Sequence, residues 1–304
     1  MSLFRHQGNI KSIMANHSVD GIYSDAWGIV EQKQRWINPN STYKDLLSIY
    51  DAKVKLDAKE SVIKELEGIC QTFQINLSKA RILDVGCGFG TFVLACIQKG
   101  YDAYGIDISK AEIQFAFSRL CTMASGIIRP EHRFVHADAR AISGELVNQF
   151  DVVTSYQVIE HVSDYKHHID ICVEYLKPGG IFIIQCPNYL WRWREPHYNV
   201  PWIPLLPKIL ARPYLRFCGM NTEYLDEQLF FVKKPLIVSY VKKKGLNVLP
   251  SFSYKIEKVD EIHSHLKRQI VFLLKKKGFH QMILSIEMLN PFVPSLSIIA
   301  QKRK

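Results

Sequence analysis

The residues whose types and spacing could do chemistry begin with a glycine-rich segment, Asp84-Val-Gly-Cys-Gly-Phe-Gly90. It follows a short β-branched run at residues 81–85. Glycine permits tight turns and close approach of the backbone to a ligand. A helix beginning after Gly90 would add free N–H groups and the positive end of its dipole. Asp84, two residues before the first glycine, suits a ligand that carries an ammonium or sulfonium group.

The same segment disfavours a nucleotide-binding dehydrogenase. That class uses a G-x-G-x-x-G motif at the end of its first strand. In this frame the sequence has Gly86 and Gly88, but Thr91 takes the place of the third glycine.

Two more acids follow later strands. Asp107 ends a run at residues 102–107, 17 residues beyond Gly90, close to the spacing of a carboxylate that accepts the hydroxyls of a ribose. Asp138 follows a third run, where it would border an adenine. Each acid alone has the alternative of capping a loop. Three acids at successive strand ends beside a glycine loop favour a binding site.

The elements that must position these acids alternate along the chain, which predicts βαβ units and a parallel sheet. Strands are expected at residues 81–85, 102–107, 133–137, 151–156, 181–186, 246–252 and 295–301. Helices are expected at residues 41–76, 91–99, 110–124, 171–176, 235–244 and 257–280. Residues 1–40 look irregular, with YSDAWG as a loop or short helix.

The expected organisation is an N-terminal segment with helices at residues 1–76 and one α/β domain at residues 77–304. The strand–helix alternation breaks after Cys186 in a stretch rich in Pro, Trp, Tyr and Arg. We expect insertions at about residues 187–232 and 255–290.

Five motifs in order, DVGCGFG, YGIDIS, HADA, FDVVTSYQVIEHV and LKPGGIFIIQCPN, make the chain similar to a known family. Over about residues 80–188 it resembles the class I S-adenosylmethionine (SAM)-dependent methyltransferases, in particular the type found in ubiquinone-biosynthesis O-methyltransferases. The resemblance implies a Rossmann-like α/β sandwich with a mostly parallel seven-stranded sheet, helices on both faces, SAM as cofactor and S-adenosylhomocysteine as product.

The resemblance also implies which residues hold SAM, all of them near the ends of the first four strands. They are Asp84, Gly86, Cys87, Gly88 and Gly90 for the methionine part, Asp107 for the ribose, Ile108, Asp138 and Ala139 for the adenine, and Tyr156 and Gln157 beside the methyl group.

Glu160 and His161 follow the fourth strand and are the candidate catalytic residues. A neutral histidine could take a proton from an acceptor hydroxyl, since its ordinary pKa is about 6.5. The alternative is a structural residue in the first turn of a helix. Some related quinone O-methyltransferases hold a divalent ion with Glu-x-x-Glu-His; here Gln157 replaces the first glutamate, so we predict no metal.

The insertion after Cys186 is expected to cover the acceptor pocket, because such pockets combine apolar walls with few polar anchors. The candidate lid residues are Trp191, Arg194, His197, Tyr198 and Trp202. The alternative is a proline-stiffened loop packed on the sheet. Tyr23 and Trp27 are expected to close over SAM from the N-terminal side.

The charge, the cysteines and the absence of long apolar runs bear on the partners and the location of the protein. The net charge is +10, and the excess lies after residue 187, where 20 Lys and Arg face 8 Asp and Glu. Such a surface could attract RNA or an anionic membrane, or serve solubility alone. Seven scattered cysteines without a CxxC pair suggest reduced thiols. No secretory signal or run of about 18 apolar residues is visible, so the expected location is the cytoplasm.

The sequence therefore predicts an enzyme that methylates a small molecule on oxygen or nitrogen, with a lipid-like or aromatic acceptor. Two alternatives stay open: an RNA methyltransferase, suggested by the basic C-terminal part, and a SAM-binding protein without catalysis. No RNA-binding module is recognisable. Peripheral membrane contact is open for residues 261–277, and the oligomeric state is not predicted.

Overall fold

The computed structural model describes residues 19–123, 132–189, 194–201, 206–249, 269 and 295–304, and its centre is one seven-stranded sheet. The strands, in chain order, are β1 (Arg81–Val85), β2 (Asp102–Asp107), β3 (Phe134–His136), β4 (Phe150–Tyr156), β5 (Leu176–Pro187), β6 (Asn247–Leu249) and β7 (Ser295–Gln301). The described helices are α2 (Val19–Ile37), α3 (Tyr43–Val54), α4 (Glu60–Thr72), α5 (Thr91–Gln98), α6 (Lys110–Met123), α7 (Tyr165–Tyr175), α8 (Lys208–Phe217), α9 (Glu223–Glu227) and α10 (Lys234–Lys243).

The strand order is β3-β2-β1-β4-β5-β7-β6. The pairs among the first five strands are parallel, whereas β7 runs antiparallel to both β5 and β6. The chain moves outward from β1 to β2 and β3, then returns to the other side of β1 with β4. Ligands of open α/β sheets bind beyond the strand ends at such a reversal, so the fold places a site where β1 and β4 end. The predicted Rossmann-like α/β fold with a mostly parallel seven-stranded sheet is confirmed.

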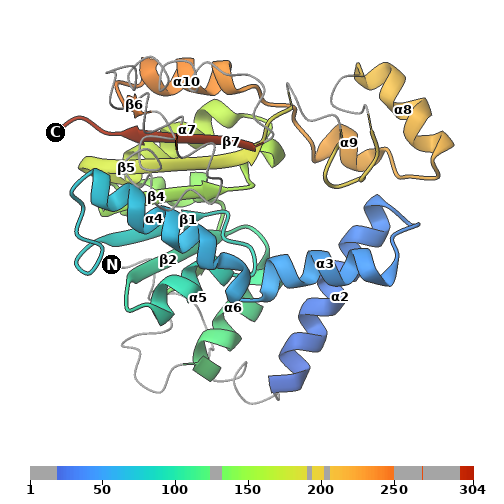
Figure 1. Ribbon diagram of the computed structural model, residues 1–304, viewed down its shortest axis with the longest axis horizontal. Helices are drawn as coiled ribbons and strands as arrows, with labels where there is room; N and C mark the ends of the chain where they lie inside the picture. The colour runs from blue at the N-terminus through green and yellow to red at the C-terminus, as the bar shows by residue number, and fades with distance from the viewer. Residues whose placement is uncertain (1–18, 124–131, 190–193, 202–205, 250–268, 270–294) are drawn as a thin grey trace.

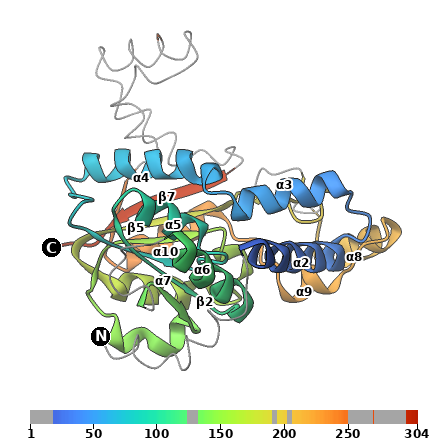
Figure 2. The ribbon, with the colours of Figure 1, turned by 90° about the horizontal axis from the view of Figure 1, so that it is seen from below.

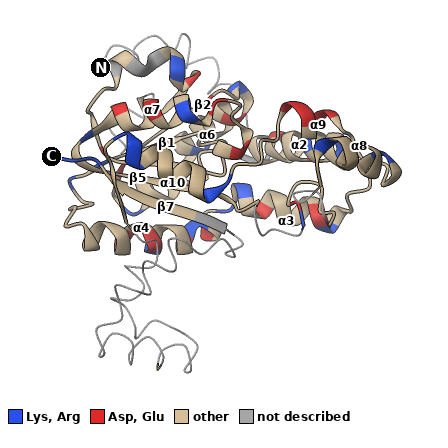
Figure 3. Cartoon of the chain, turned by 90° about the horizontal axis from the view of Figure 1, so that it is seen from above, with Lys and Arg blue, Asp and Glu red and all other residues tan. Residues whose placement is uncertain are grey.

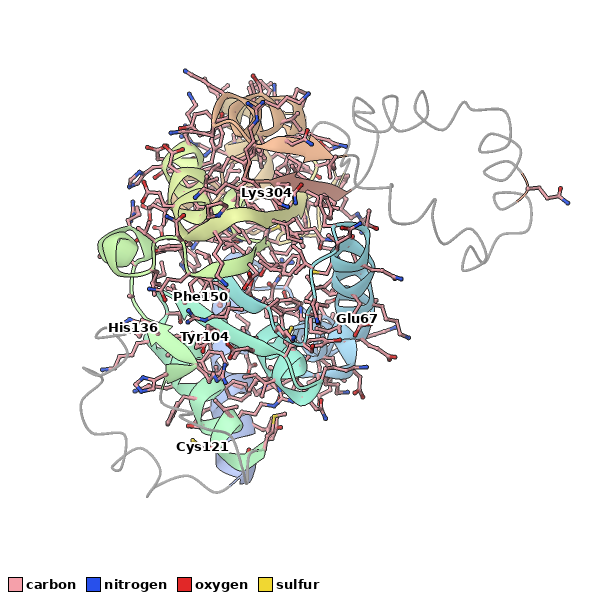
Figure 4. All side chains as sticks on the ribbon, turned by 90° about the vertical axis from the view of Figure 1, so that its left-hand side faces the viewer. Glu67, Tyr104, Cys121, His136, Phe150 and Lys304 are labelled. Carbon is pink, nitrogen blue, oxygen red and sulfur yellow. The ribbon has the colours of Figure 1, made fainter. Side chains whose placement is uncertain are left out.

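Helices cover both faces of the sheet (Figure 1, Figure 2). Successive strand residues point to opposite faces, so Ile82 packs with α4, α5 and α6 while Leu83 packs with α7 and α10. Aromatic rings also meet across β1: Tyr104 of β2 and Phe150 of β4, labelled in Figure 4, lie edge to face with centroids 5.9 Å apart.

A second group of helices lies beyond the carboxyl ends of the parallel strands, where α2, α3, α8 and α9 gather (Figure 1). The end of α2 joins this group through Ile37, which is buried with Tyr198, Leu215 and Tyr224. The group thus brings the N-terminal segment against the chain that follows β5, and it faces the edge of the sheet that the topology marks as a site.

The N-terminal region differs from the expectation. Residues 19–37 form one continuous helix, and YSDAWG is part of it rather than a loop or short helix. Its buried side chains Ile22, Ala26, Val30 and Ile37 recur at helical spacing. This face packs against α3 and α6.

Several other boundaries differ. The helix expected at residues 41–76 is broken at Lys55, whose backbone is extended, before a 3-10 turn at Asp57–Lys59. Strand β5 begins at Leu176 rather than at the expected residue 181, and Gly179 within it has φ +81°. The insertion at residues 187–232 contains α8 and α9. The helix expected at residues 257–280 lies outside the described residues, apart from Gln269.

Two glycines provide a matched stability test. Gly90 has φ +66°, and a Cβ there would lie 2.5 Å from Phe134 Cε1 and 2.6 Å from Ala116 Cβ. Gly28 lies in α2 with nothing within 4 Å of such an atom. We expect Gly90→Ala to lower the free energy of unfolding by about 1–3 kcal/mol and Gly28→Ala to raise it by about 0.5–1 kcal/mol. Urea unfolding checks both; equal effects would contradict this account of the loop.

Candidate functional site

The glycine segment forms a tight turn between β1 and α5. Gly86, Gly88 and Gly90 all have positive φ, at +82°, +52° and +66°. The amides of Gly86 and Cys87 both donate to the carbonyl of Ile106 in β2, at 2.8 and 3.1 Å. A Cβ at Gly86 would lie 2.4 Å from Val158 Cγ2, so a side chain there would collide with the segment after β4. The loop therefore brings bare backbone to the ends of β1, β2 and β4.

Cys87 cannot offer its thiol to a ligand in this loop. Its Sγ lies against Gly105 in β2, 2.6 Å from where a Cβ on that glycine would be. Burial raises the pKa of the thiol well above its ordinary value. Only the backbone of Cys87 is available to the predicted cofactor.

Asp84 is a buried carboxylate without a basic residue in direct contact among the described side chains. It is 3% exposed, and Thr154 Oγ1 donates to its Oδ1 at 2.7 Å. Burial raises the pKa of Asp84 to about 7, while Thr154 and the more distant Lys59 oppose the rise. A ligand ammonium group would supply the missing positive charge, which fits the methionine part of SAM.

Asp107 ties the end of β2 to the glycine loop. Its carboxylate accepts from the amide of Gly88 at 2.8 Å and from the amide of Ser109 at 2.8 Å. Glu112, in the first turn of α6, also faces the loop, since its Oε2 would lie 3.2 Å from a Cβ on Gly88. Burial raises the pKa of Glu112. Glu112 was not predicted from the sequence, although its place in the first turn of the helix after Asp107 is a usable signal.

The predicted adenine residues lie at the surface. Ile108 is 73% exposed, an apolar side chain open to a flat ring. Asp138 accepts from the Nε of Arg140 at 2.9 Å, and this ion pair lowers the pKa of Asp138. The backbone of Ala139 is held by the hydroxyl of Tyr175, which donates to its carbonyl at 2.7 Å.

The fourth strand ends in two differently placed residues. The ring of Tyr156 packs edge to face on Phe92, with centroids 5.0 Å apart. Gln157 has φ +57°, and its amide donates to the carbonyl of Gln185 at 2.7 Å. The Gln157 side chain is exposed at the strand end, so it is open to a ligand there.

The N-terminal helices cover the glycine loop. Phe89 of the loop packs on Phe115, and Tyr23 of α2 packs on the same ring, with centroid distances of 5.3 and 6.0 Å. The buried Arg119 donates to the carbonyl of Val54 and lies over the Tyr23 ring. Tyr23 thus approaches the loop through Phe115.

Trp27 faces α3 instead of the loop. Its ring packs on Tyr43 and Tyr50, with both centroid distances at 5.4 Å, and its Nε1 donates to Glu31. Its predicted closure over SAM is therefore not supported by this arrangement.

On the acceptor side, Glu160 and His161 form a 3-10 turn between β4 and α7, not the first turn of a helix. Glu160 is fully buried. The Nδ1 of His161 lies 2.8 Å from the carbonyl of Gln228, so the neutral ring donates from Nδ1 and keeps its lone pair on Nε2. Burial, together with repulsion from His197, lowers the pKa of His161 to about 3.

The described part of the predicted lid is a short hairpin at residues 194–201. The amide of Glu195 donates to the carbonyl of Val200 at 3.0 Å, and Arg194 bonds the side chain of Asn199 at 3.2 Å. Arg194 points to solvent, whereas Tyr198 is buried. Trp191 and Trp202, with Arg192 and Trp193, lie outside the described residues.

The hairpin brings His197 to His161. Their rings meet edge to face with centroids 5.0 Å apart, and the ring of Tyr224 in α9 lies 5.3 Å from that of His197. Tyr224 is 1% exposed, and its hydroxyl has no hydrogen-bond partner among the described residues. Among the described residues this hydroxyl is therefore available to bond a ligand that reaches the two histidines. Neither Tyr224 nor Glu195 was predicted from the sequence, because neither belongs to one of the recognised motifs.

The described residues contain no group of three or more His, Cys, Asp or Glu arranged to hold a metal ion. Within the same part of the chain, no helix has the length and apolarity needed to cross a membrane.

The chain matches a known protein family. A family model described as "Methyltransferase domain" matches residues 58–219, more than half of the chain. The chain belongs to this methyltransferase family. The match confirms the predicted resemblance and agrees with SAM as cofactor. The matched residues include the glycine loop, the acids at the strand ends and the His161 turn.

Two relatives are ubiquinone biosynthesis O-methyltransferases. The one from Leptothrix cholodnii is 31% identical over 52% of this chain and 60% of its own length. The one from Bordetella avium is 34% identical over 48% of this chain and 53% of its own length. The match thus spans little more than half the length of these relatives.

Among solved structures, magnesium protoporphyrin IX methyltransferase from Synechocystis aligns with a TM-score of 0.49 and 14% identity over 92% of this chain and 96% of its own. Phosphoethanolamine N-methyltransferase 2 from Haemonchus contortus aligns with a TM-score of 0.47 and 18% identity over 79% of this chain and 52% of its own.

The ribose assignment is tested by Asp107→Ala. Loss of a charged acceptor should weaken SAM binding by about 1.5–3 kcal/mol, and loss of the bond to the Gly88 amide acts in the same direction. Isothermal titration with SAM measures the change, with Asp57→Ala, an exposed acid outside the site, as control. Unchanged affinity in Asp107→Ala would refute the placement of the ribose.

The charge on Asp84 makes SAM binding depend on pH. Its folded pKa is about 7, so below pH 7 the free protein carries a proton there that the ammonium group must displace. We therefore expect affinity to fall by up to about tenfold per pH unit between pH 7 and 5. Asp84→Asn should bind SAM more weakly and lose most of this dependence. Equal affinities of the native protein at pH 5.5 and 7.5 would contradict the role of Asp84.

Proposed function

We propose that this protein transfers a methyl group from SAM to a hydroxyl group of a small aromatic or lipid-like molecule. The observation that carries the proposal is that the rings of His161 and His197 and the buried Tyr224 hydroxyl are grouped beside the end of β4. The names of the O-methyltransferase relatives support oxygen as the methylated atom.

Different residues would hold different parts of SAM. Asp84 and the glycine loop would hold the methionine end of SAM, and Asp107 the ribose. When bound, SAM supplies an electrophilic methyl group on a sulfur that leaves readily. Alignment of the acceptor oxygen with that methyl group is then the main demand on the protein.

His161 is better suited to orient the acceptor than to act as its general base. A general base works best with a pKa near the working pH, and the pKa of His161 is lowered to about 3. Its Nε2 lone pair can still accept a hydrogen bond from the acceptor hydroxyl. This interpretation narrows the base role predicted from sequence.

The acceptor class follows from the walls around these groups. The rings of His161, His197, Tyr198 and Tyr224 pack on one another, and Trp36 packs on Tyr224 with centroids 5.9 Å apart. Rings of this kind favour an aromatic acceptor with few polar groups. No specific observation among the described residues favours RNA as the acceptor or SAM binding without catalysis. The two-part organisation at residue 77 and the cytoplasmic location stay predictions.

The labelling experiment uses SAM with a deuterated methyl group, the purified protein and extract from its own cell. We expect label in an organic-soluble phenol or catechol, identified by mass spectrometry. Label confined to RNA or protein would overturn the small-molecule proposal, and SAM binding without label in any fraction would favour a protein that does not catalyse.

His161→Ala tests the acceptor side separately from the cofactor. Loss of an orienting hydrogen bond should lower turnover of the labelled acceptor about ten- to a hundredfold, with SAM affinity within about twofold. His167→Ala is the control, since His167 is an exposed histidine of α7. Turnover equal to that of the control would remove His161 from the mechanism.

A further inference from the structure

Glu195 is a fully buried carboxylate that is committed to one histidine. Its Oε1 lies 2.8 Å from His197 Nδ1, and its Oε2 accepts from the amides of His197 at 2.7 Å and Tyr198 at 2.8 Å. The Tyr189 hydroxyl donates to Oε1 at 3.4 Å. All four contacts are donors, so both carboxylate oxygens have hydrogen-bond partners at this depth.

These contacts fix the His197 ring in one tautomer. Because a carboxylate accepts and does not donate, Nδ1 carries the proton and Nε2 carries the lone pair. The backbone of His197 is also held, since the side chain of Gln34 in α2 donates to the carbonyl of His197 at 3.1 Å. The ring has little freedom to reorient, so its Nε2 is presented to one place.

That place adjoins the predicted reaction site. The His197 ring lies 5.0 Å from the His161 ring and 5.3 Å from the Tyr224 ring. A Cβ on Gly86 of the glycine loop would lie 2.4 Å from Val158, whose carbonyl accepts from the amide of His161 at 2.8 Å. The histidine pair therefore adjoins the glycine loop through the turn that follows β4.

The two histidines differ in the group that accepts a hydrogen bond from Nδ1. A backbone carbonyl supports His161, whereas a buried carboxylate supports His197. A carboxylate behind Nδ1 stabilises the imidazolium that forms when Nε2 takes a proton. A proton released by an acceptor hydroxyl is therefore better stabilised on His197, which has the carboxylate, than on His161, which has only a carbonyl.

We propose that His197, oriented by Glu195, is the general base of the methyl transfer, with the acceptor hydroxyl held between His197 Nε2, His161 Nε2 and the Tyr224 hydroxyl. The O–H bond breaks as its proton moves to His197 Nε2. The acceptor oxygen forms its bond to the methyl carbon, and the electron pair of the broken S–C bond stays on sulfur. Glu195 acts as a positioning residue. This inference rests on the proposed function, since it needs a hydroxyl acceptor.

Glu195→Gln is the decisive variant, because it keeps the size of the side chain and an oxygen for the two backbone amides. Its NH₂ group can donate to His197 Nδ1, which would move the ring proton to Nε2 and abolish the base. We expect kcat for the labelled acceptor to fall at least about a hundredfold. The KM for the acceptor should change much less. Glu227→Gln, which removes an exposed charge from α9, should behave as the native protein.

A second measurement needs no acceptor. In protein labelled with ¹⁵N-histidine and saturated with S-adenosylhomocysteine, NMR should show a proton on His197 Nδ1 and a lone pair on Nε2, and Glu195→Gln should reverse them. The amide spectrum of the variant establishes that it is folded, and Glu195→Asp provides a rescue if the glutamine variant is not, with kcat between the native and His197→Ala values.

The outcomes separate the two proposals. Turnover in Glu195→Gln within about twofold of Glu227→Gln, or a native His197 that carries its proton on Nε2, would overturn the dyad. Failure of the native protein to label any small molecule counts against the proposed function, and the tautomer measurement then still decides whether Glu195 holds His197 as we propose.

Discussion

The backbone turn from Gly86 to Gly90 is the constraint on which the rest of the structure depends. Its positive φ angles let the chain leave β1 and enter α5 within five residues. Its neighbours have filled the space that side chains would need, with Val158 against Gly86 and Phe134 against Gly90. The segment after β4, the end of β2 and the first turn of α6 are thus all positioned by contact with bare backbone.

Burial of charge around this turn follows from the same packing. Asp84 and Glu112 both have a raised pKa because folding removes them from water. Such groups cost stability unless a partner compensates. A cationic ligand would provide that compensation at Asp84, which agrees with the predicted place of the methionine part of SAM. Glu195 differs, since four donors already satisfy it.

The acceptor side is assembled from segments far apart in sequence. His161 follows β4, His197 belongs to the hairpin after β5, and Tyr224 belongs to α9. Helix α2 supports them from the N-terminal side through Gln34, Trp36 and Ile37. In Figure 3 acidic residues mark α9 and basic residues mark α8, and Arg212 pairs with Asp226 between the two helices at 3.0 Å. This helical group therefore has its own packing and charge pairing while it completes the site.

The sequence by itself determined the strand–helix alternation, the glycine turn and the acids at strand ends, because these depend on local backbone preference and on hydrophobic runs a few residues long. Asp84, Asp107 and His161 could be named on that basis. Tertiary structure decided which side chains are available: Cys87 turns its thiol into the sheet, Trp27 faces α3, and residues 19–37 become one helix. It alone decided the Glu195–His197 pair and the place of Tyr224, because contacts between segments tens of residues apart depend on how the chain folds back, and no local spacing encodes that.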